Sequence, residues 1–137
     1  MPTVLATSDA SSSGLAGHMS HEGKVLVAYR NFSPVEAACS STWRELIAIK
    51  FSLESFANLL KGKSVLWRTD NYAASLIVPS GSRVPRLQAI AEEIYEFCYS
   101  LEVSLTVKWV PRENIQIADA LSKIPDHDDW EVTPQFF

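Results

Sequence analysis

The sequence lacks the features that would place it in a membrane, outside the cell or around a structural zinc ion. Its 137 residues include only two cysteines, Cys39 and Cys98, and these have no metal-ligand spacing. Its apolar runs are far too short to span a bilayer, and its first residues lack the basic start and apolar segment of a secretory signal. We therefore expect an intracellular protein of the cytoplasm or nucleus, without membrane contact and with reduced thiols, and a single disulfide is the alternative.

The chain also lacks the excess of positive charge that is typical of proteins that bind nucleic acids. It has 12 Lys and Arg residues against 16 Asp and Glu residues, a net charge of −4. The acids are unevenly placed, because Asp126, Asp128, Asp129 and Glu131 lie close together near the C-terminus and four others occupy special positions in the pattern of strands and helices. Without these two groups the remaining surface would carry an excess of Lys and Arg. The acidic balance therefore does not exclude a phosphate-bearing partner.

The length and the order of predicted elements indicate one α/β domain over residues 1–124. Strands are predicted at residues 3–8, 15–21, 24–32, 65–69 and 103–110, and helices at residues 42–60, after Asp70, from Pro85 onward and at residues 114–123. Because the first three strands form a meander and the last two follow helical crossovers, we expect a five-stranded mixed sheet, antiparallel and then parallel, with helices on both faces. Residues 125–137 have no clear period and are predicted to form an acidic C-terminal tail or linker.

Four acidic residues fall where the strand ends and first helical turns of such a sheet would meet. Asp9 follows the first strand, Glu45 lies on the first long helix, Asp70 ends the fourth strand and Asp119 lies on the last short helix. Carboxylates gathered at one point repel one another unless divalent cations lie between them. The pattern therefore predicts a two-metal site of the kind used for phosphoryl transfer.

Each of these acids also has a local structural explanation. Asp9 precedes a serine-rich turn whose amides it could satisfy, and an exposed acid such as Asp119 is common near the start of a helix. Thr42 and Glu45 have the spacing of a capping box, and Asp70 is placed to cap the next helix. The coincidence of all four at one end of the sheet favours a shared site over four separate local roles.

The segments that carry these acids resemble the ribonuclease H family. SDASSSGLAG, SSTWRELIAI, LWRTDNYAA and WVPRENIQIADALSK match that family's ligand order of Asp, Glu, Asp and Asp, over roughly residues 3 to 124. The last segment is similar to the ribonuclease H domains of retroelement reverse transcriptases. The spacing of REL-x-AI and TDN-x-A, with the trailing DHDDWEV, resembles the tyrosine-recombinase, DIRS-like retrotransposons. The resemblance implies a ribonuclease H-like fold.

The same resemblance implies an endoribonuclease that cleaves the RNA strand of RNA–DNA hybrids during retrotransposon reverse transcription. The implied cofactors are two Mg²⁺ ions, for which Mn²⁺ can substitute. Asp9 would bridge the two ions, Asp119 would complete the ion that activates the attacking water, and Glu45 and Asp70 would complete the ion at the leaving 3′-oxygen. The implied partners are the hybrid and an adjoining polymerase domain, and the isolated domain is expected to be a monomer.

The sequence departs from the cellular members of the family in two places. The segment Val110–Asn114 before the last Asp is short and has no His, and the basic protrusion that grips substrate is reduced to Arg83 and Arg86. These departures leave a second interpretation open, in which the domain is catalytically weak or inactive and serves as a structural or connection module of a polyprotein.

Substrate contacts are expected beside the carboxylates. Recognition of RNA requires small polar groups near the 2′-hydroxyl, and phosphates require cations. The candidates are Ser11, Ser12, Gly14 and Asn71 for the sugar, and Arg83 and Arg86 for phosphates. An ordinary solvated surface is the alternative for each, and the tryptophans Trp43, Trp67 and Trp109 are predicted to pack rather than to stack on bases.

Two other nucleases of the same superfamily fit the chain less well. A proofreading exonuclease would need a second acid two residues after Asp9, where Ser11 stands. An integrase or transposase would place its last carboxylate, a Glu, on a helix after the fourth strand, whereas here Glu45 precedes Asp70. The residues therefore favour a ribonuclease H.

Overall fold

The computed structural model describes residues 3–112 and 131–136, with side chains described up to residue 112. The strands are β1 (Thr3–Ala10), β2 (Gly14–His21), β3 (Lys24–Asn31), β4 (Ser64–Thr69), β5 (Ser104–Trp109) and β6 (Glu131–Phe136). The helices are α1 (Pro34–Ala37), α2 (Ser41–Ser55), α3 (Ala57–Leu60), α4 (Tyr72–Ser80) and α5 (Pro85–Ser100). Among the described residues, no helix combines the length and apolar character needed to cross a membrane.

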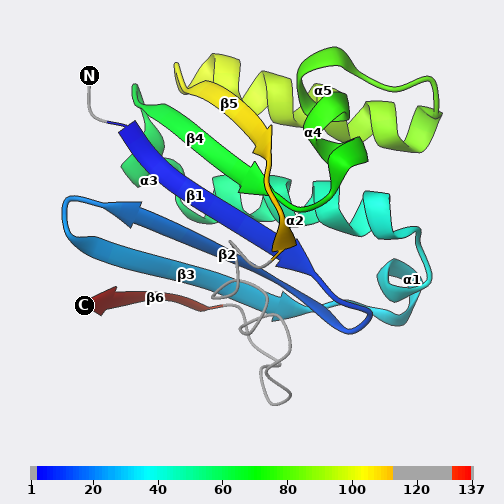
Figure 1. Ribbon diagram of the computed structural model, residues 1–137, viewed down its shortest axis with the longest axis horizontal. Coiled ribbons are helices and arrows are strands. Elements are labelled where there is room, and N and C mark those ends of the chain that lie inside the picture. Colours follow the sequence, from blue (N-terminus) through cyan, green and yellow to red (C-terminus); the bar gives the residue numbers. More distant parts are fainter. Residues whose placement is uncertain (1–2, 113–130, 137) are drawn as a thin grey trace.

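The strands form one mixed sheet in the order β5-β4-β1-β2-β3-β6 (Figure 1). The strands β1, β2 and β3 pair antiparallel, whereas β4 lies parallel to β1 and β5 lies parallel to β4. This confirms the predicted order of three antiparallel strands followed by two parallel ones. The parallel pairing of β1 with β4 is what matters for function, because it brings the carboxyl ends of the two strands to the same edge of the sheet.

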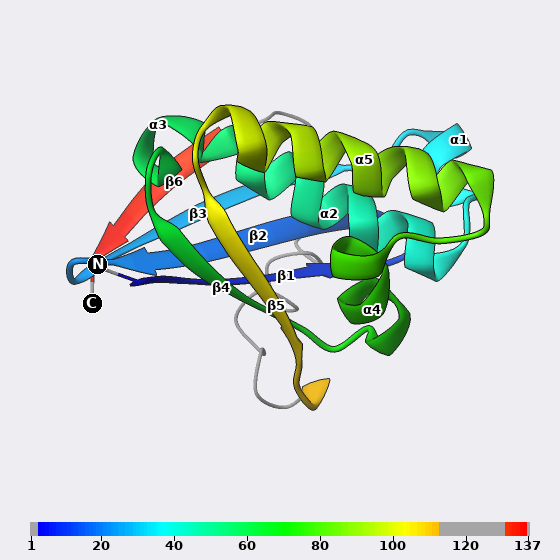
Figure 2. The ribbon, with the colours of Figure 1, turned by 90° about the horizontal axis from the view of Figure 1, so that it is seen from above.

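The helices α2 and α5 lie together on one side of the sheet (Figure 2), where α2 packs on β1 and β2, and α4 packs on α5 and β5. The core between the layers includes Trp67, Leu46 and Ile49, all fully buried. The indole N–H of Trp67 donates a hydrogen bond of 2.9 Å to Ser8 Oγ, so the prediction that this tryptophan packs is confirmed. The helix predicted at residues 114–123 lies outside the described residues.

Two elements differ from their predictions. The helix predicted over residues 42–60 is divided at Phe56, whose φ of −104° and ψ of 17° end α2 before the short α3 begins. Within the region predicted as a tail, Glu131–Phe136 pairs antiparallel with β3 as the edge strand β6. Pro134 lies in this strand, and an edge strand tolerates proline because one of its sides needs no ladder hydrogen bonds. Cys39 and Cys98 are free thiols, as predicted.

Gly17 permits the close approach of α2 to the sheet. A Cβ atom at this position of β2 would lie 1.9 Å from Ser52 Oγ and 2.5 Å from Ser52 Cβ. Ser52 cannot turn away freely, because it is fully buried and its hydroxyl donates a hydrogen bond of 2.7 Å to Ala48 O. The absence of a side chain at Gly17 therefore sets the distance between the helix and the strand.

We expect Gly17→Ala to lower the free energy of unfolding by about 1–3 kcal/mol, because the extra methyl group overpacks this contact. Urea denaturation followed by circular dichroism would measure the change. The double variant Gly17→Ala/Ser52→Gly removes the opposing side chain and should recover part of the loss. An alanine variant as stable as the wild type would show that α2 can move away from β2 at no cost.

Candidate metal centre

Three of the four predicted acids converge at the carboxyl ends of β1 and β4. Asp9 lies near the end of β1, Asp70 follows β4 directly, and Glu45 projects from the second turn of α2. Figure 1 shows the ends of β1 and β4 meeting beside α2. One carboxylate oxygen from each residue lies within 4.8 Å of the other two. We call these three residues the acidic triad.

The local explanation for Glu45 is wrong. The N-cap of α2 is Ser40, whose hydroxyl accepts a hydrogen bond of 3.2 Å from the Trp43 amide, and Thr42 lies inside the helix. Glu45 is therefore not needed to cap the helix. Its Oε1 instead accepts a hydrogen bond of 3.1 Å from the Ala10 amide, which ties α2 to the end of β1.

Neighbouring residues also perform the local roles considered for Asp70 and Asp9. Asn71 is the N-cap of α4, since its side-chain oxygen accepts a hydrogen bond of 2.8 Å from the Ala74 amide. The turn after β1 is closed by Ser11, whose hydroxyl accepts from the Ser13 and Gly14 amides. Asp9 Oδ1 accepts a hydrogen bond of 2.9 Å from the adjacent Ala10 amide, so the caps and the turn do not depend on the Asp side chains alone.

The triad is largely shielded from water. Asp9 is fully buried and Glu45 is 6% exposed, and among the residues that the structure describes the buried Oε2 of Glu45 has no hydrogen-bond partner. Burial raises the pKa of Glu45 to about 9, and the charges of Asp9 and Asp70 act in the same direction. A buried carboxylate oxygen without a donor, beside two other acids, fits a divalent cation of the hard, oxygen-preferring kind. Within the described part of the chain this is the only such group of three potential ligands.

Arg112 is a member of the site that the sequence did not reveal. Its guanidinium donates hydrogen bonds of 2.8 Å to Asp70 Oδ2 and 3.2 Å to Asp9 Oδ2. The two partners lie 42 and 103 residues earlier in the chain, and the segment around Arg112 has no periodic pattern. No sequence signal could therefore have predicted this pairing.

The predicted sugar contacts lie around the triad, but several are already engaged. Ser11 and Ser12 lie in the turn after β1, where Ser12 is exposed and the carbonyl of Ser11 accepts 2.7 Å from Arg44. Gly14 is buried as the first residue of β2, so it offers no free surface. The side chain of Asn71 caps α4. Asp119, the fourth predicted ligand, lies outside the described residues.

The two predicted phosphate contacts lie near the start of α5. Arg83 is exposed in the loop between α4 and α5. The Arg86 guanidinium donates a hydrogen bond of 3.0 Å to Cys39 Sγ in the segment before α2, and its Cζ lies 5.9 Å from the centroid of the Trp43 ring. Both arginines are exposed, and these two contacts partly engage Arg86.

An exposed aromatic pair beside Asp70 also escaped prediction. Trp109, expected to pack, is 49% exposed, and its indole N–H donates 3.1 Å to the carbonyl of Asp70. Tyr72, 64% exposed, meets it edge to face with ring centroids 6.5 Å apart. Two exposed aromatic rings next to a carboxylate cluster are consistent with a surface that contacts nucleotides.

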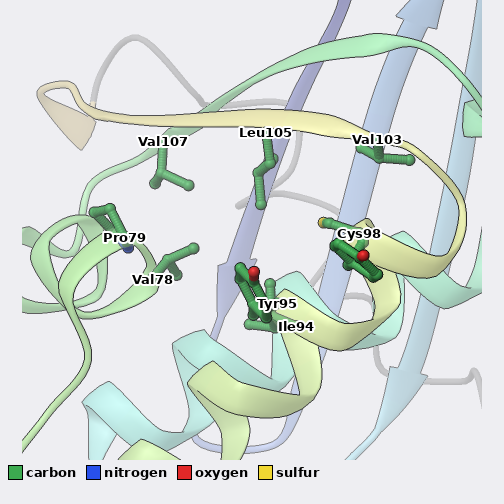
Figure 3. A pocket seen from close by; sticks show the side chains of 9 residues that line it. Val78, Pro79, Ile94, Tyr95, Cys98, Val103, Leu105 and Val107 are labelled. Carbon is green, nitrogen blue, oxygen red and sulfur yellow. The ribbon is translucent and has the colours of Figure 1, made fainter.

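The apolar cavity in Figure 3 is a separate feature. It encloses about 310 Å³ between α4, α5 and β5, and the side chains that point into it include Val78, Ile94 and Leu105. No member of the acidic triad lines it. The acidic triad at the strand ends is therefore separate from this cavity.

A mixed sheet of this order, with carboxylates on its first strand, first long helix and fourth strand, defines the ribonuclease H-like class. The family described as the RNase H-like domain found in reverse transcriptase matches residues 2–97. The chain belongs to this family.

One curated relative and two solved structures show the breadth of the similarity. The Retrovirus-related Pol polyprotein from transposon 412 of Drosophila melanogaster is 32% identical over 120 residues, which are 85% of this chain and 9% of that polyprotein. RNase H1 from the archaeon Halobacterium salinarum has a TM-score of 0.74 at 18% identity, covering 88% of this chain and 94% of its own. LC11-RNase H1, solved in complex with an RNA/DNA hybrid, has a TM-score of 0.71 at 16% identity, with coverages of 89% and 94%. These structures support the fold, and the relative supports a retroelement origin.

Proposed function

We propose that this domain is a hybrid-specific endoribonuclease that cleaves the RNA strand of RNA–DNA hybrids. The observation that carries the proposal is the acidic triad, in which carboxylates from β1, α2 and the end of β4 lie within 4.8 Å of one another. Asp119 is proposed as the fourth ligand. The proposed product ends are a 3′-hydroxyl and a 5′-phosphate.

Asp9, Glu45, Asp70 and Asp119 would hold two Mg²⁺ or Mn²⁺ ions. When bound, such ions supply a nucleophilic water at neutral pH and stabilise the charge on the leaving 3′-oxygen. The protein fixes the ligands in advance, because the Ala10 amide donates both to Glu45 Oε1 and to Asp9 Oδ1. This positions two of the carboxylates without any contribution from the substrate.

The surroundings of the triad suit a nucleic-acid substrate. Ser12 in the exposed turn after β1 offers a small hydroxyl group of the kind that contacts a 2′-hydroxyl. Trp109, whose indole is bonded to the carbonyl of Asp70, and Tyr72 offer aromatic faces beside Asp70. Arg83 and Arg86 are both exposed, and Arg83 is the preferred phosphate contact because Cys39 and Trp43 partly engage Arg86. We propose that the hybrid crosses the triad between these surfaces.

The chain spans 9% of the length of the transposon polyprotein it resembles, so we propose that it acts within a larger reverse transcriptase. The adjoining polymerase domain would then hold the hybrid and supply much of the affinity, which fits the net charge of −4. The narrower assignment to DIRS-like retrotransposons is part of this proposal and rests on the REL-x-AI and TDN-x-A spacing with the trailing DHDDWEV segment.

The test is cleavage of a labelled RNA–DNA hybrid in Mg²⁺ or Mn²⁺, beside duplex DNA, duplex RNA and single-stranded RNA. We expect cutting of the hybrid alone, with loss of activity when EDTA removes the metal, because only the hybrid offers the 2′-hydroxyl and groove geometry that the site would read. An Asp70→Asn preparation controls for contaminating nucleases. Equal cutting of single-stranded RNA would contradict hybrid specificity.

A structural or connection module is the second candidate, and the pairing of Arg112 with Asp9 and Asp70 favours it, because a cation from the chain itself engages the carboxylates. This candidate predicts no cleavage of any of the four substrates, even when the adjoining polymerase domain is present in the same polypeptide. Cleavage restored by the polymerase domain would instead support the enzyme.

A further inference from the structure

Arg112 donates one hydrogen bond to Asp70 and one to Asp9, and we call this pair of hydrogen bonds the fork. The fold holds the backbone before Arg112 close to these acids. Arg112 follows the end of β5, whose neighbour Val110 donates its amide to Thr69 O at 2.9 Å. The indole of Trp109 is bonded to the carbonyl of Asp70 at 3.1 Å. These two contacts hold the backbone before Arg112 against the end of β4, and they thereby place Arg112 close to Asp70.

The fork uses the oxygens that a metal ion would need. Each guanidinium nitrogen takes a different carboxylate, since Nη1 lies 2.8 Å from Asp70 Oδ2 and Nη2 lies 3.2 Å from Asp9 Oδ2. The two acids are almost enclosed, with the side chain of Asp9 1% exposed and that of Asp70 12% exposed, whereas the Arg112 side chain is 53% exposed. The half-exposed arginine therefore reaches two nearly enclosed carboxylates from the solvent side.

We propose that Arg112 is an internal counter-ion of the metal-free site, which releases Asp9 and Asp70 when a divalent cation binds. This inference rests on the proposed function, because it takes the acidic triad to be a metal site. Two cations cannot engage the same carboxylate oxygens at once without strong repulsion. The fork thus stabilises the metal-free domain and lowers its affinity for metal by the same free energy.

The size of the effect follows from the exposure of the arginine. A fork with two charge-assisted hydrogen bonds is stronger than an ordinary surface ion pair, but solvent screens a half-exposed guanidinium. We expect Arg112→Ala to bind Mn²⁺ about three- to tenfold more tightly than the wild type. We also expect its metal-free form to unfold at a lower temperature, because Asp9 and Asp70 then lose their counter-ion.

Other roles of Arg112 predict other effects on Mn²⁺ binding. If Arg112 served to position the carboxylates for metal, its removal would weaken Mn²⁺ binding. If it were only a surface charge, its removal would act like the loss of any other arginine. Arg83→Ala is the matched control, because it removes the same side chain from the exposed loop between α4 and α5. Arg112→Gln serves as a second variant with a shorter, uncharged side chain that can still donate a hydrogen bond.

The experiment is Mn²⁺ titration followed by electron paramagnetic resonance, which counts free Mn²⁺ and requires no catalysis. Tighter binding by Arg112→Ala and Arg112→Gln, with Arg83→Ala equal to the wild type, is the expected result. Unchanged or weaker binding in both Arg112 variants would overturn the inference and leave the metal site intact. Asp70→Asn separates the inference about Arg112 from the proposed metal site. If this variant bound Mn²⁺ as tightly as the wild type, the metal site itself would be overturned, and the inference about Arg112 with it.

Discussion

Asp70→Asn should reduce Mg²⁺-dependent cleavage of the RNA strand by about a thousandfold or more. Asparagine keeps the volume of the side chain and one oxygen, but it removes the negative charge that a divalent cation requires. The fold should persist, because Asp70 follows β4 and the cap of α4 is its neighbour Asn71. Initial rates on a labelled hybrid, with circular dichroism of both proteins, would measure the two effects separately.

Glu54→Gln is the matched control for this variant. Glu54 lies near the end of α2 and is half exposed, and its carboxylate pairs with Lys50 at 3.2 Å. The control makes the same chemical change as the site variant, at a position where a surface ion pair contributes little. Cleavage by Asp70→Asn at the rate of the control would remove Asp70 from the site, and with it the assignment of the triad.

The local patterns in the sequence were sufficient for most of the fold. The strand predicted at residues 24–32 is Lys24–Asn31, and that predicted at 65–69 is Ser64–Thr69, because alternating or continuous apolar residues between turn residues determine where strands lie. The break at Phe56 was missed because apolar residues recur at helical spacing on both sides of it. The strand β6 was missed because its partner β3 is distant in sequence and its own pattern contains a proline.

Part of the site could likewise be predicted from local sequence patterns, and part depends on contacts between residues distant in the sequence. Asp9 and Asp70 stand at the ends of recognisable strands, and a parallel crossover brings such ends together, so their meeting follows from topology. The sequence could not separate Glu45 as a helix cap from Glu45 as a ligand, because both roles use the same spacing. That distinction required the observation that Ser40 caps α2. The pairing of Arg112 depended entirely on tertiary structure.

Glu45→Gln should have opposite effects on activity and on the stability of the metal-free domain. Cleavage should fall by about a hundredfold or more, because a charged ligand is lost. The metal-free protein should nevertheless become more stable near neutral pH. Glutamine is uncharged like the protonated acid, and it keeps the oxygen that accepts the Ala10 amide. A residue that is costly for folding and necessary for chemistry is typical of active sites.

The pH dependence gives this prediction its sign. The pKa of Glu45 rises from 4.5 in the unfolded chain to about 9 in the metal-free fold, so between these values the folded state holds a proton that the unfolded state has lost. The contribution of Glu45 to stability is therefore complete below the lower pKa and declines as the pH rises toward the upper one. Glutamine does not titrate, so the advantage of the variant over the wild type should grow with pH.

Urea unfolding in EDTA at about pH 5 and about pH 8 would measure this difference, with Glu93→Gln, an exposed change of the same kind on α5, as the control. Saturating Mg²⁺ should then stabilise the wild type more than Glu45→Gln, because a bound cation favours the ionised carboxylate that only the wild type possesses. A variant that loses stability at both pH values would show that Glu45 is held as a charged structural residue. A variant that gains stability without metal and loses the response to Mg²⁺ would connect the buried acid directly to metal binding.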